Sequence, residues 1–126
     1  MPESMLVDHV IHGRGQASAK VLFPVFNPAT GEISARLALG GTSEIDLAVK
    51  AAQEAFPAWA ATPPHVRARV LFRLRDLIEN NLDRLAAIIT AEHGKVLSDA
   101  KGELIRGLEV VEFACGIPQL LKGQFS

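Results

Sequence analysis

The sequence has little of what marks secreted, membrane-spanning or metal-binding proteins. It contains one cysteine, which excludes an internal disulfide framework and is typical of a reducing compartment. No apolar run in the sequence approaches the roughly 18 residues that a membrane span needs. Residues Met1–Leu6 lack the basic and hydrophobic regions of a secretory signal. We therefore expect a soluble, cytoplasmic protein.

The sequence also lacks an excess of either charge. Lysine and arginine number 13 against 14 aspartates and glutamates, for a net charge of −1 and a pI of about 6.4. This balance argues against nucleic acid or an anionic membrane as the main partner. His9, His12 and His65 do not have the spacing of metal ligands, and no carboxylate cluster completes a site. We therefore expect no metal site. With 48% hydrophobic residues in 126, the composition is that of a globular domain.

The first third of the chain has the pattern of β-strands. Strands are predicted at Val7–His12, Val21–Phe26 and Ile33–Leu39. The segment Asn27–Gly31 contains an Asn-Pro and a Thr-Gly pair, which mark a turn between two antiparallel strands. Gly13–Gly15 is interpreted as a turn, because a dinucleotide fingerprint needs a third glycine that opens a helix after a strand.

From Thr42 onward the hydrophobic period becomes helical. The first helix is predicted to place one apolar face at Ile45, Ala48, Val49, Ala52, Phe56 and Trp59. Thr62–Pro64 ends this helix and begins a second, because proline is accepted at a helix's first position. In the second helix Arg75 and Glu79 are four residues apart and can pair.

A short, very apolar third helix begins near Leu82 and is predicted to end at Gly94 in the left-handed conformation. A long fourth helix is predicted from Ser98 toward Leu121, with the Ser98 side chain as its N-terminal cap. Pro118 is expected to bend this helix, because it removes the hydrogen bond to the carbonyl of the residue four before it.

The helices lack a partner within the sequence. Four helices with wide apolar faces follow the strands, and no further strands come after them to receive those faces. Either the helices form a bundle among themselves, or the sheet that they cover lies in sequence that is absent here. The missing strands favour the second interpretation. We divide the chain into N-terminal strands at 1–41 and a helical part at 42–126.

Several segments carry a family resemblance. They are Asn27–Glu32 (NPATGE), Ala55–Trp59 (AFPAW), Arg69–Leu74 and Glu92–Lys95 (EHGK). In this order they resemble the N-terminal part of the aldehyde dehydrogenase superfamily. Within that superfamily Ser98–Glu103, Arg106-Gly107 and Glu109–Pro118 resemble the CoA-acylating methylmalonate-semialdehyde dehydrogenases. The NPATGE segment is shared widely, whereas the stretch from Glu103 to Pro118 is much more specific.

The resemblance implies an α/β parent fold, of which this chain is an incomplete part with a β-hairpin region followed by about four amphipathic helices. It also implies that the strands at 1–41 form an edge or oligomerisation region and that 42–126 is the helical beginning of the NAD-binding domain. In such enzymes a cysteine thiolate attacks the aldehyde, hydride passes to NAD, and the thioester is transferred to CoA with loss of CO2. The family's catalytic cysteine, oxyanion-hole asparagine and cofactor loop lie farther along than this sequence extends. We therefore expect no catalytic and no cofactor-binding residue here. NAD and CoA are not expected to bind this chain alone, which we expect to be inactive.

The same resemblance identifies Arg106 as the candidate site residue. An arginine at this position of the acylating subfamily faces the substrate pocket and holds the carboxylate of the semialdehyde. Guanidinium suits that role because it binds a carboxylate through two parallel hydrogen bonds. Gly107 would let another segment or a ligand come close. The alternative is an ion pair with Glu103 or Glu109, each three residues away on the helix.

Other candidates have simpler interpretations. Cys115 does not match the family's nucleophile segment and has no histidine nearby in sequence, so an inert, buried thiol is expected. His93 is interpreted as a helix-end residue without a role in proton transfer. The arginines at 67, 69, 73 and 75 are interpreted as a solvated helix face.

The resemblance also implies partners: the remainder of the dehydrogenase chain, a homo-oligomer and a small semialdehyde substrate. Two other classes of function stay open at this point. The chain could be an autonomous interaction module that docks on a partner through exposed apolar faces. A weaker alternative is a helical nucleic-acid binder that uses the arginine-bearing helix and depends steeply on salt.

Overall fold

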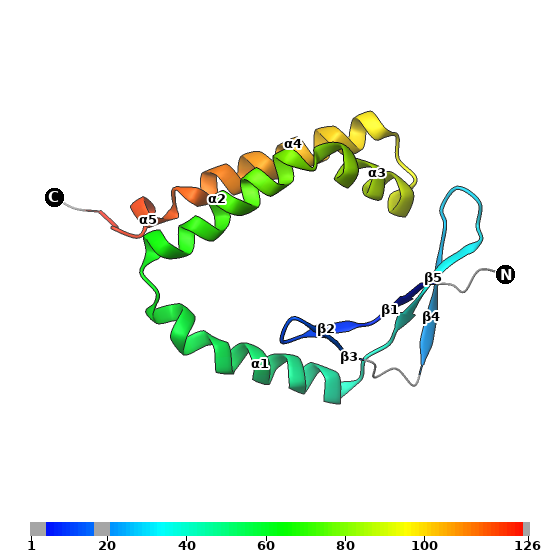
Figure 1. The fold of residues 1–126 in the computed structure, drawn as a ribbon, viewed down its shortest axis with the longest axis horizontal. Helices are drawn as coiled ribbons and strands as arrows, with labels where there is room; N and C mark the ends of the chain where they lie inside the picture. The colour runs from blue at the N-terminus through cyan, green and yellow to red at the C-terminus, as the bar shows by residue number, and fades with distance from the viewer. Residues whose placement is uncertain (1–4, 17–20, 125–126) are drawn as a thin grey trace. The chain divides into compact units, whose positions relative to one another are not determined.

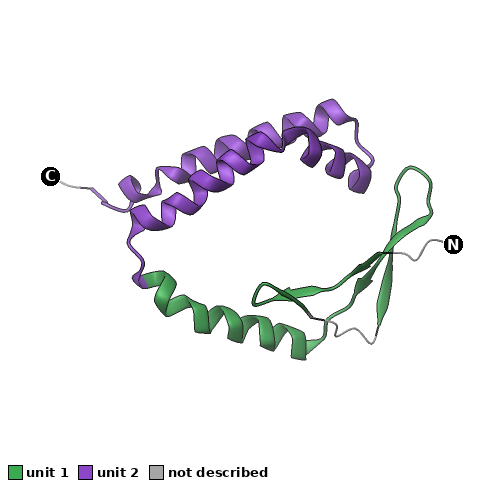
Figure 2. Ribbon diagram, viewed as in Figure 1, with its two compact units in different colours: residues 1–60 green, residues 61–126 purple. Residues whose placement is uncertain are grey.

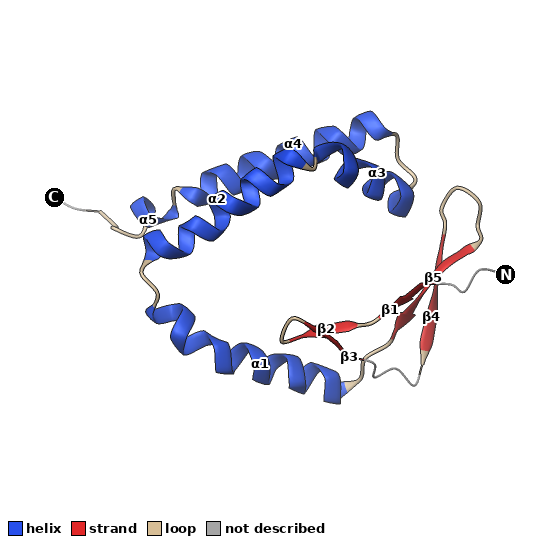
Figure 3. Ribbon diagram, in the orientation of Figure 1, coloured by secondary structure: helices blue, strands red, loops and turns tan. Residues whose placement is uncertain are grey.

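The computed structural model describes residues 5–16 and 21–124 (Figure 1). The chain divides into two compact units, Met1–Ala60 and Ala61–Ser126 (Figure 2). Every described strand lies in the first unit, and four of the five helices lie in the second (Figure 3). The unit boundary falls at the end of the first helix, so the sequence-based division between residues 41 and 42 stays a prediction. The expectation that Met1–Leu6 contains no secretory signal falls largely on residues 1–4, outside the described part.

The first unit contains a three-stranded sheet in the order β1-β5-β4. Its strands are β1 (Met5–Val7), β4 (Leu22–Phe26) and β5 (Ile33–Ala38). The strands β4 and β5 are antiparallel, whereas β1 lies parallel to β5. The turn between β4 and β5 is the predicted one, and the Asn27 side chain accepts a hydrogen bond of 2.8 Å from the backbone N–H of Ala29. The NPATGE segment therefore forms its hairpin through local hydrogen bonds.

A second, smaller hairpin differs from the sequence-based interpretation. It consists of β2 (His9–Ile11) and β3 (Arg14–Gln16), which pair in antiparallel fashion. The two residues between the strands have positive φ angles, 55° at His12 and 69° at Gly13. A two-residue loop of this kind matches the twist of the flanking strands. The turn predicted at Gly13–Gly15 is therefore placed one residue too late, because Arg14 and Gly15 already belong to a strand.

The helix α1 (Thr42–Ala61) begins with a capping interaction. The backbone N–H of Gly41 donates to Oε2 of Glu44 at 2.7 Å, and the Ser43 hydroxyl donates to the same oxygen at 3.0 Å. These two hydrogen bonds lower the pKa of Glu44 and satisfy a donor that the helix start leaves free. No residue of α1 is buried, and Phe56 on its predicted apolar face is 66% exposed. The amphipathic pattern is present, but the face is uncovered.

The second unit is helical throughout. Its elements are α2 (Pro64–Asn80), α3 (Leu82–His93), α4 (Leu97–Cys115) and α5 (Ile117–Leu120). The helix α4 packs against both α2 and α3 (Figure 1). Each of these three helices buries one alanine, with exposures of 6% at Ala68, 0% at Ala86 and 0% at Ala100. Small side chains at these positions let the helix backbones approach closely.

The helix ends follow the sequence in part. Gly94 ends α3 with a φ of 79°, and its N–H donates to the carbonyl of Thr90, as predicted. The helix α4 begins at Leu97 with Val96 as its N-cap and no side-chain cap, so the prediction that Ser98 caps this helix is wrong. The predicted bend at Pro118 is also wrong, because α4 ends before it and Pro118 lies in the first turn of α5. Proline fits that position because the first turn does not need its missing N–H.

The core of the described residues is built from small side chains. Its buried apolar members are Ile11 and five alanines, which remove little apolar surface from water. Larger side chains remain accessible, among them Val110 at 67% and Phe113 at 70% on α4. Across residues 5–16 and 21–124, no helix is both long and apolar enough to cross a bilayer.

Candidate functional site

The candidate residue Arg106 lies on an exposed face of α4. One turn earlier, a Cβ added to Gly102 would lie 3.7 Å from Nη1 of Arg106, which is ordinary van der Waals contact. A Cβ added to Gly107 would meet nothing within 4 Å. The Arg106 side chain therefore passes close to Gly102, and a Cβ at 102 would fit beside it. No described residue makes the close approach that these glycines led us to expect.

One of the two carboxylates that lie three residues from Arg106 on the helix is bound by another residue. Glu103 accepts a hydrogen bond from Nζ of Lys95, with a distance of 3.0 Å to Oε2. Among the described residues, the Arg106 guanidinium has neither an ion pair nor a hydrogen bond with Glu103 or Glu109. The role of Arg106 in holding a substrate carboxylate stays a prediction. We define Lys95, Glu103 and Arg106 as the Glu103 cluster.

The charges of this cluster keep Glu103 ionised. The pKa of Glu103 is lowered, chiefly by the hydrogen bond from Lys95 and by its positive charge. His93 and Arg106 lower this pKa further, and partial desolvation opposes them. His93 is the last residue of α3, as the sequence predicted. The end of α3, the connecting loop and the middle of α4 thus gather three basic groups around one carboxylate.

Two further sets of ion pairs hold α4 against its neighbours. Arg75 on α2 binds Glu79 at 2.6 Å, as predicted, and also binds Glu112 on α4 at 3.0 Å. Its pKa is raised, first of all by the hydrogen bond to Glu112. Lys101 on α4 lies 2.5 Å from Asp83 on α3. These contacts fix α4 against α2 and α3, and with it the position of Arg106.

Cys115 stands at the C-terminal end of α4 as a free thiol. It is half-buried, and therefore less buried than expected from its apolar sequence context. The reason is its place at the last residue of the helix, where fewer neighbours surround a side chain. In the described part of the chain, no group of three histidine, cysteine, aspartate or glutamate residues could hold a metal ion.

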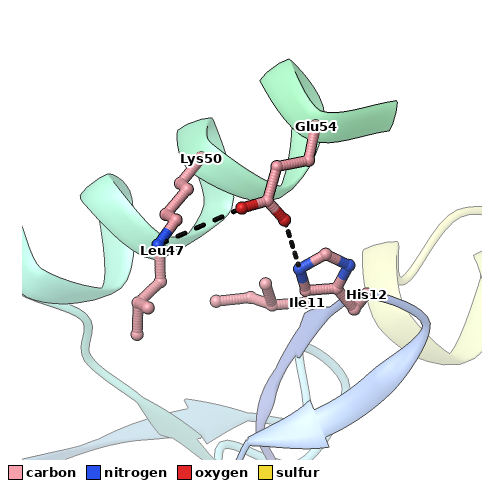
Figure 4. A pocket seen from close by; sticks show the side chains of 5 residues that line it. All are labelled: Ile11, His12, Leu47, Lys50 and Glu54. Atoms are coloured by element: carbon pink, nitrogen blue, oxygen red, sulfur yellow. Dashed lines mark ion pairs between the residues drawn. The ribbon is translucent and has the colours of Figure 1, made fainter. Parts of the chain in front are cut away.

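The first unit contains a cavity of about 200 Å³ between the β2–β3 hairpin and α1 (Figure 4). At its edge Nε2 of His12 lies 3.8 Å from Oε2 of Glu54, and Nζ of Lys50 lies 4.0 Å from Oε1 of the same residue. All three side chains are more than half exposed. Exposed pairs of this kind contribute about 0–1 kcal/mol. They join the hairpin only weakly to α1.

The start of α1 does not suit a dinucleotide phosphate. A strand, two glycines and a helix follow one another there, which is the order of some phosphate-binding loops. However, the N–H of Gly41 already donates to the Glu44 carboxylate, whose charge would repel a phosphate. A Cβ at Gly40 would lie 3.0 Å from the His9 ring. The glycine at position 40 therefore provides space for the His9 side chain. NAD does not fit the residues at this position.

Comparison with known proteins identifies the family. Residues 15–126 match the aldehyde dehydrogenase family. The chain belongs to the aldehyde dehydrogenase family. A malonate-semialdehyde dehydrogenase of Pseudomonas aeruginosa is 47% identical over 118 residues, which are 94% of this chain and 24% of that protein. The acylating mitochondrial methylmalonate-semialdehyde dehydrogenase of Arabidopsis thaliana is 43% identical over 87% of this chain and 18% of its own length.

Solved structures agree with this assignment. The methylmalonate-semialdehyde dehydrogenase of Oceanimonas doudoroffii matches 95% of this dehydrogenase-family chain with a TM-score of 0.91 and 48% identity. A Sinorhizobium meliloti protein, described as a methylmalonate-semialdehyde dehydrogenase and solved with NAD, matches the whole chain with a TM-score of 0.92 and 41% identity. The chain covers 25% and 26% of these two proteins. Strands followed by helices are therefore part of the aldehyde dehydrogenase fold, and the chain spans about a quarter of it.

Sequence reasoning missed Lys95 as a member of the candidate site. Lys95 and Glu103 are eight residues apart and on opposite sides of a helix start. No helical or strand periodicity pairs residues at that spacing. The only sequence feature that pointed to this place was the EHGK segment of the family resemblance.

Proposed function

We propose that this chain is the N-terminal part of an NAD-dependent, CoA-acylating dehydrogenase of methylmalonate or malonate semialdehyde. The whole enzyme converts the semialdehyde to propionyl-CoA or acetyl-CoA and releases CO2, with NAD and CoA as co-substrates. The observation that carries the proposal is the 47% identity to a malonate-semialdehyde dehydrogenase over 94% of this chain. The likeness to the acylating plant relative supports CoA as the thioester acceptor.

In this proposal residues 1–126 supply no reacting group. The strands serve as edge strands of an oligomerisation region, and the helices cover a cofactor-binding sheet built from the remainder of the dehydrogenase chain. The exposed apolar side chains of α1 and α4 support such a role, among them Phe56 at 66% and Phe113 at 70% exposure. Covering one large apolar side chain stabilises a fold by about 1.5–3 kcal/mol. The whole enzyme is a homo-oligomer, as the resemblance implies.

The proposed role of Arg106 is to bind the carboxylate of the substrate. Its guanidinium is exposed and has no carboxylate partner among the described residues. Methylmalonate and malonate semialdehyde both carry a carboxylate next to the carbon that bears the aldehyde. A planar guanidinium binds that group through two hydrogen bonds and so orients the aldehyde as well.

The first test compares this chain with an extended chain. The extended chain consists of residues 1–126 followed by the remaining part of the Pseudomonas aeruginosa relative. NADH formation is measured with methylmalonate semialdehyde and CoA. We expect turnover from the extended chain and none from residues 1–126 alone. Turnover by residues 1–126 alone would contradict the proposal that these residues supply no reacting group.

The second part of the test addresses Arg106 in the extended chain. Arg106→Gln should raise KM for methylmalonate semialdehyde at least about ten-fold, because a hydrogen bond to a charged group contributes about 1.5–3 kcal/mol. Propanal, which lacks a carboxylate, serves as the control substrate and should keep its KM. An equal loss with both substrates would show that Arg106 does not recognise the carboxylate.

A further inference from the structure

We propose that Lys95 is a positioning residue that keeps Arg106 available for the substrate. It does so by holding the Glu103 carboxylate, which would otherwise pair with Arg106. This inference rests on the proposed function of Arg106 and adds a second residue to the recognition of the substrate carboxylate. Lys95 itself does not touch the substrate.

The geometry of the Glu103 cluster is the first observation behind this proposal. A glutamate three residues before an arginine on a helix is placed to form an ion pair with it. Glu103 and Arg106 have that spacing on α4, yet Glu103 is bound by Lys95 from the loop before the helix, at 3.0 Å. The Lys95 side chain is only 23% exposed, whereas that of Glu103 is 53% exposed. The lysine is therefore the better-packed member of the pair and directs where the carboxylate lies.

Electrostatics in the cluster lead to the same conclusion. Lys95 is the largest influence on the Glu103 carboxylate, and Arg106 is the smallest of those that act on it. Glu109, the other carboxylate three residues from Arg106, also forms no ion pair within the described part of the chain. The guanidinium thus stays unpaired even though two carboxylates on its own helix could reach it.

The consequence for the enzyme concerns binding rather than chemistry. Without Lys95, the Glu103 carboxylate pairs with the neighbouring Arg106 guanidinium. The substrate carboxylate must then displace Glu103 from Arg106 in order to bind. This competition raises KM for substrates that carry a carboxylate. It leaves kcat unchanged, because a substrate that has bound has already displaced Glu103 and is held by the same guanidinium as in the wild type. A plain aldehyde does not use Arg106 and is not affected.

The test uses the extended chain and a double-mutant cycle. Lys95→Met should raise KM for methylmalonate semialdehyde about two- to five-fold, the factor that corresponds to an exposed ion pair. Its kcat and its KM for propanal should stay those of the wild type. Glu103→Gln alone should leave KM unchanged. Adding Glu103→Gln to Lys95→Met should restore the wild-type KM, because an amide does not compete for the guanidinium. Lys95→Arg should also behave like the wild type.

The matched control is Lys101→Met. Lys101 also joins α4 to α3 through one carboxylate, that of Asp83 in the first turn of α3, and the Lys101 side chain is 39% exposed. It does not contact Glu103, so its loss should leave KM for both substrates unchanged. An equal rise of KM in Lys101→Met and Lys95→Met would mean that any loosening of α4 has this effect, and would overturn the proposal.

The remaining outcomes separate the two proposals. If the double variant is as impaired as Lys95→Met, then Lys95 does not act through Glu103 and this inference is wrong. If Arg106→Gln changes the preference for carboxylate substrates but Lys95→Met leaves that preference unchanged, the proposed role of Lys95 is wrong and that of Arg106 stands. If Arg106→Gln leaves that preference unchanged, the proposed function of Arg106 falls, and the role of Lys95 falls with it.

Discussion

At the scale of single residues, the proposed recognition of the substrate depends on the Glu103 cluster. Lys95 holds Glu103 at 3.0 Å and leaves Arg106 without a partner in the described residues. The other polar contacts of the second unit are structural, such as the three carboxylates around Arg75. Arg106 is exposed and positively charged, and its guanidinium has no ion pair in the described part of the chain, so it can bind a carboxylate from outside.

The pKa of Glu103 provides a test at this scale. In the folded chain it lies below the ordinary value of 4.5, chiefly because of Lys95. The stabilisation from this pair is therefore present above pH 4.5 and is lost as the pH falls through the lowered pKa. We expect an acid titration of the Glu103 carboxyl carbon by NMR to have its midpoint below 4.5 in the wild type. In Lys95→Met the midpoint should move up toward the ordinary value. An unchanged midpoint would contradict the contact.

At the scale of elements, the second unit depends on the close approach of three helices. The alanines at 68, 86 and 100 are at most 6% exposed. A small residue at each contact replaces the interlocking of large side chains that a self-sufficient helical bundle uses. The large apolar residues of the same helices face outward, so the packing between helices is tight but contributes little burial.

Two neighbouring alanines of α3 test this description. Ala86 is fully buried, whereas Ala87 is exposed. Ala86→Leu should destabilise the extended chain by about 1–3 kcal/mol, because extra methylene groups in a filled contact force the helices apart. Ala87→Leu is the matched control and should change the free energy of unfolding by less than about 0.5 kcal/mol. Chemical denaturation of both variants measures the difference, and equal effects would show that Ala86 is not a packing contact.

At the scale of the whole molecule, the chain is about a quarter of the proteins that it matches. Its strands and helices have the order found in the family, but its large apolar side chains remain uncovered. Trp59 on α1 is 48% exposed, and Val110 on α4 is 67% exposed. In the proposed enzyme, these faces lie against the remainder of the dehydrogenase chain.

Urea titration tests this interpretation on the chain itself. Residues 1–126 should unfold in a broad, weakly cooperative transition and should bind a hydrophobic dye strongly, because little apolar surface is buried. The extended chain should unfold more sharply and bind less dye per molecule. A compact monomer of residues 1–126 that unfolds sharply and binds no dye would favour an autonomous module instead.

Three local features were determined by the sequence alone. The hairpin at Asn27–Glu32 and the left-handed end of α3 at Gly94 depend on hydrogen bonds within a few residues. The Arg75–Glu79 pair depends only on helical spacing. The family assignment, too, follows from short segments such as EHGK. Each of these features is complete within one turn or one helix, which is why a sequence pattern is sufficient to predict it.

The tertiary structure decided what joins distant residues. The contact of Arg75 with Glu112 bridges 37 positions, and that of Lys95 with Glu103 bridges a loop and a helix start. Which alanines become buried contacts depends on which helix faces pack together. The sequence of one helix does not show which of its faces will meet another helix. Glu103 was expected to be an alternative partner of Arg106 because their spacing allows it. It binds Lys95 instead, because the folded loop brings the Lys95 ammonium group to the Glu103 carboxylate. Helical spacing alone could not predict that Lys95 would compete with Arg106 for this carboxylate.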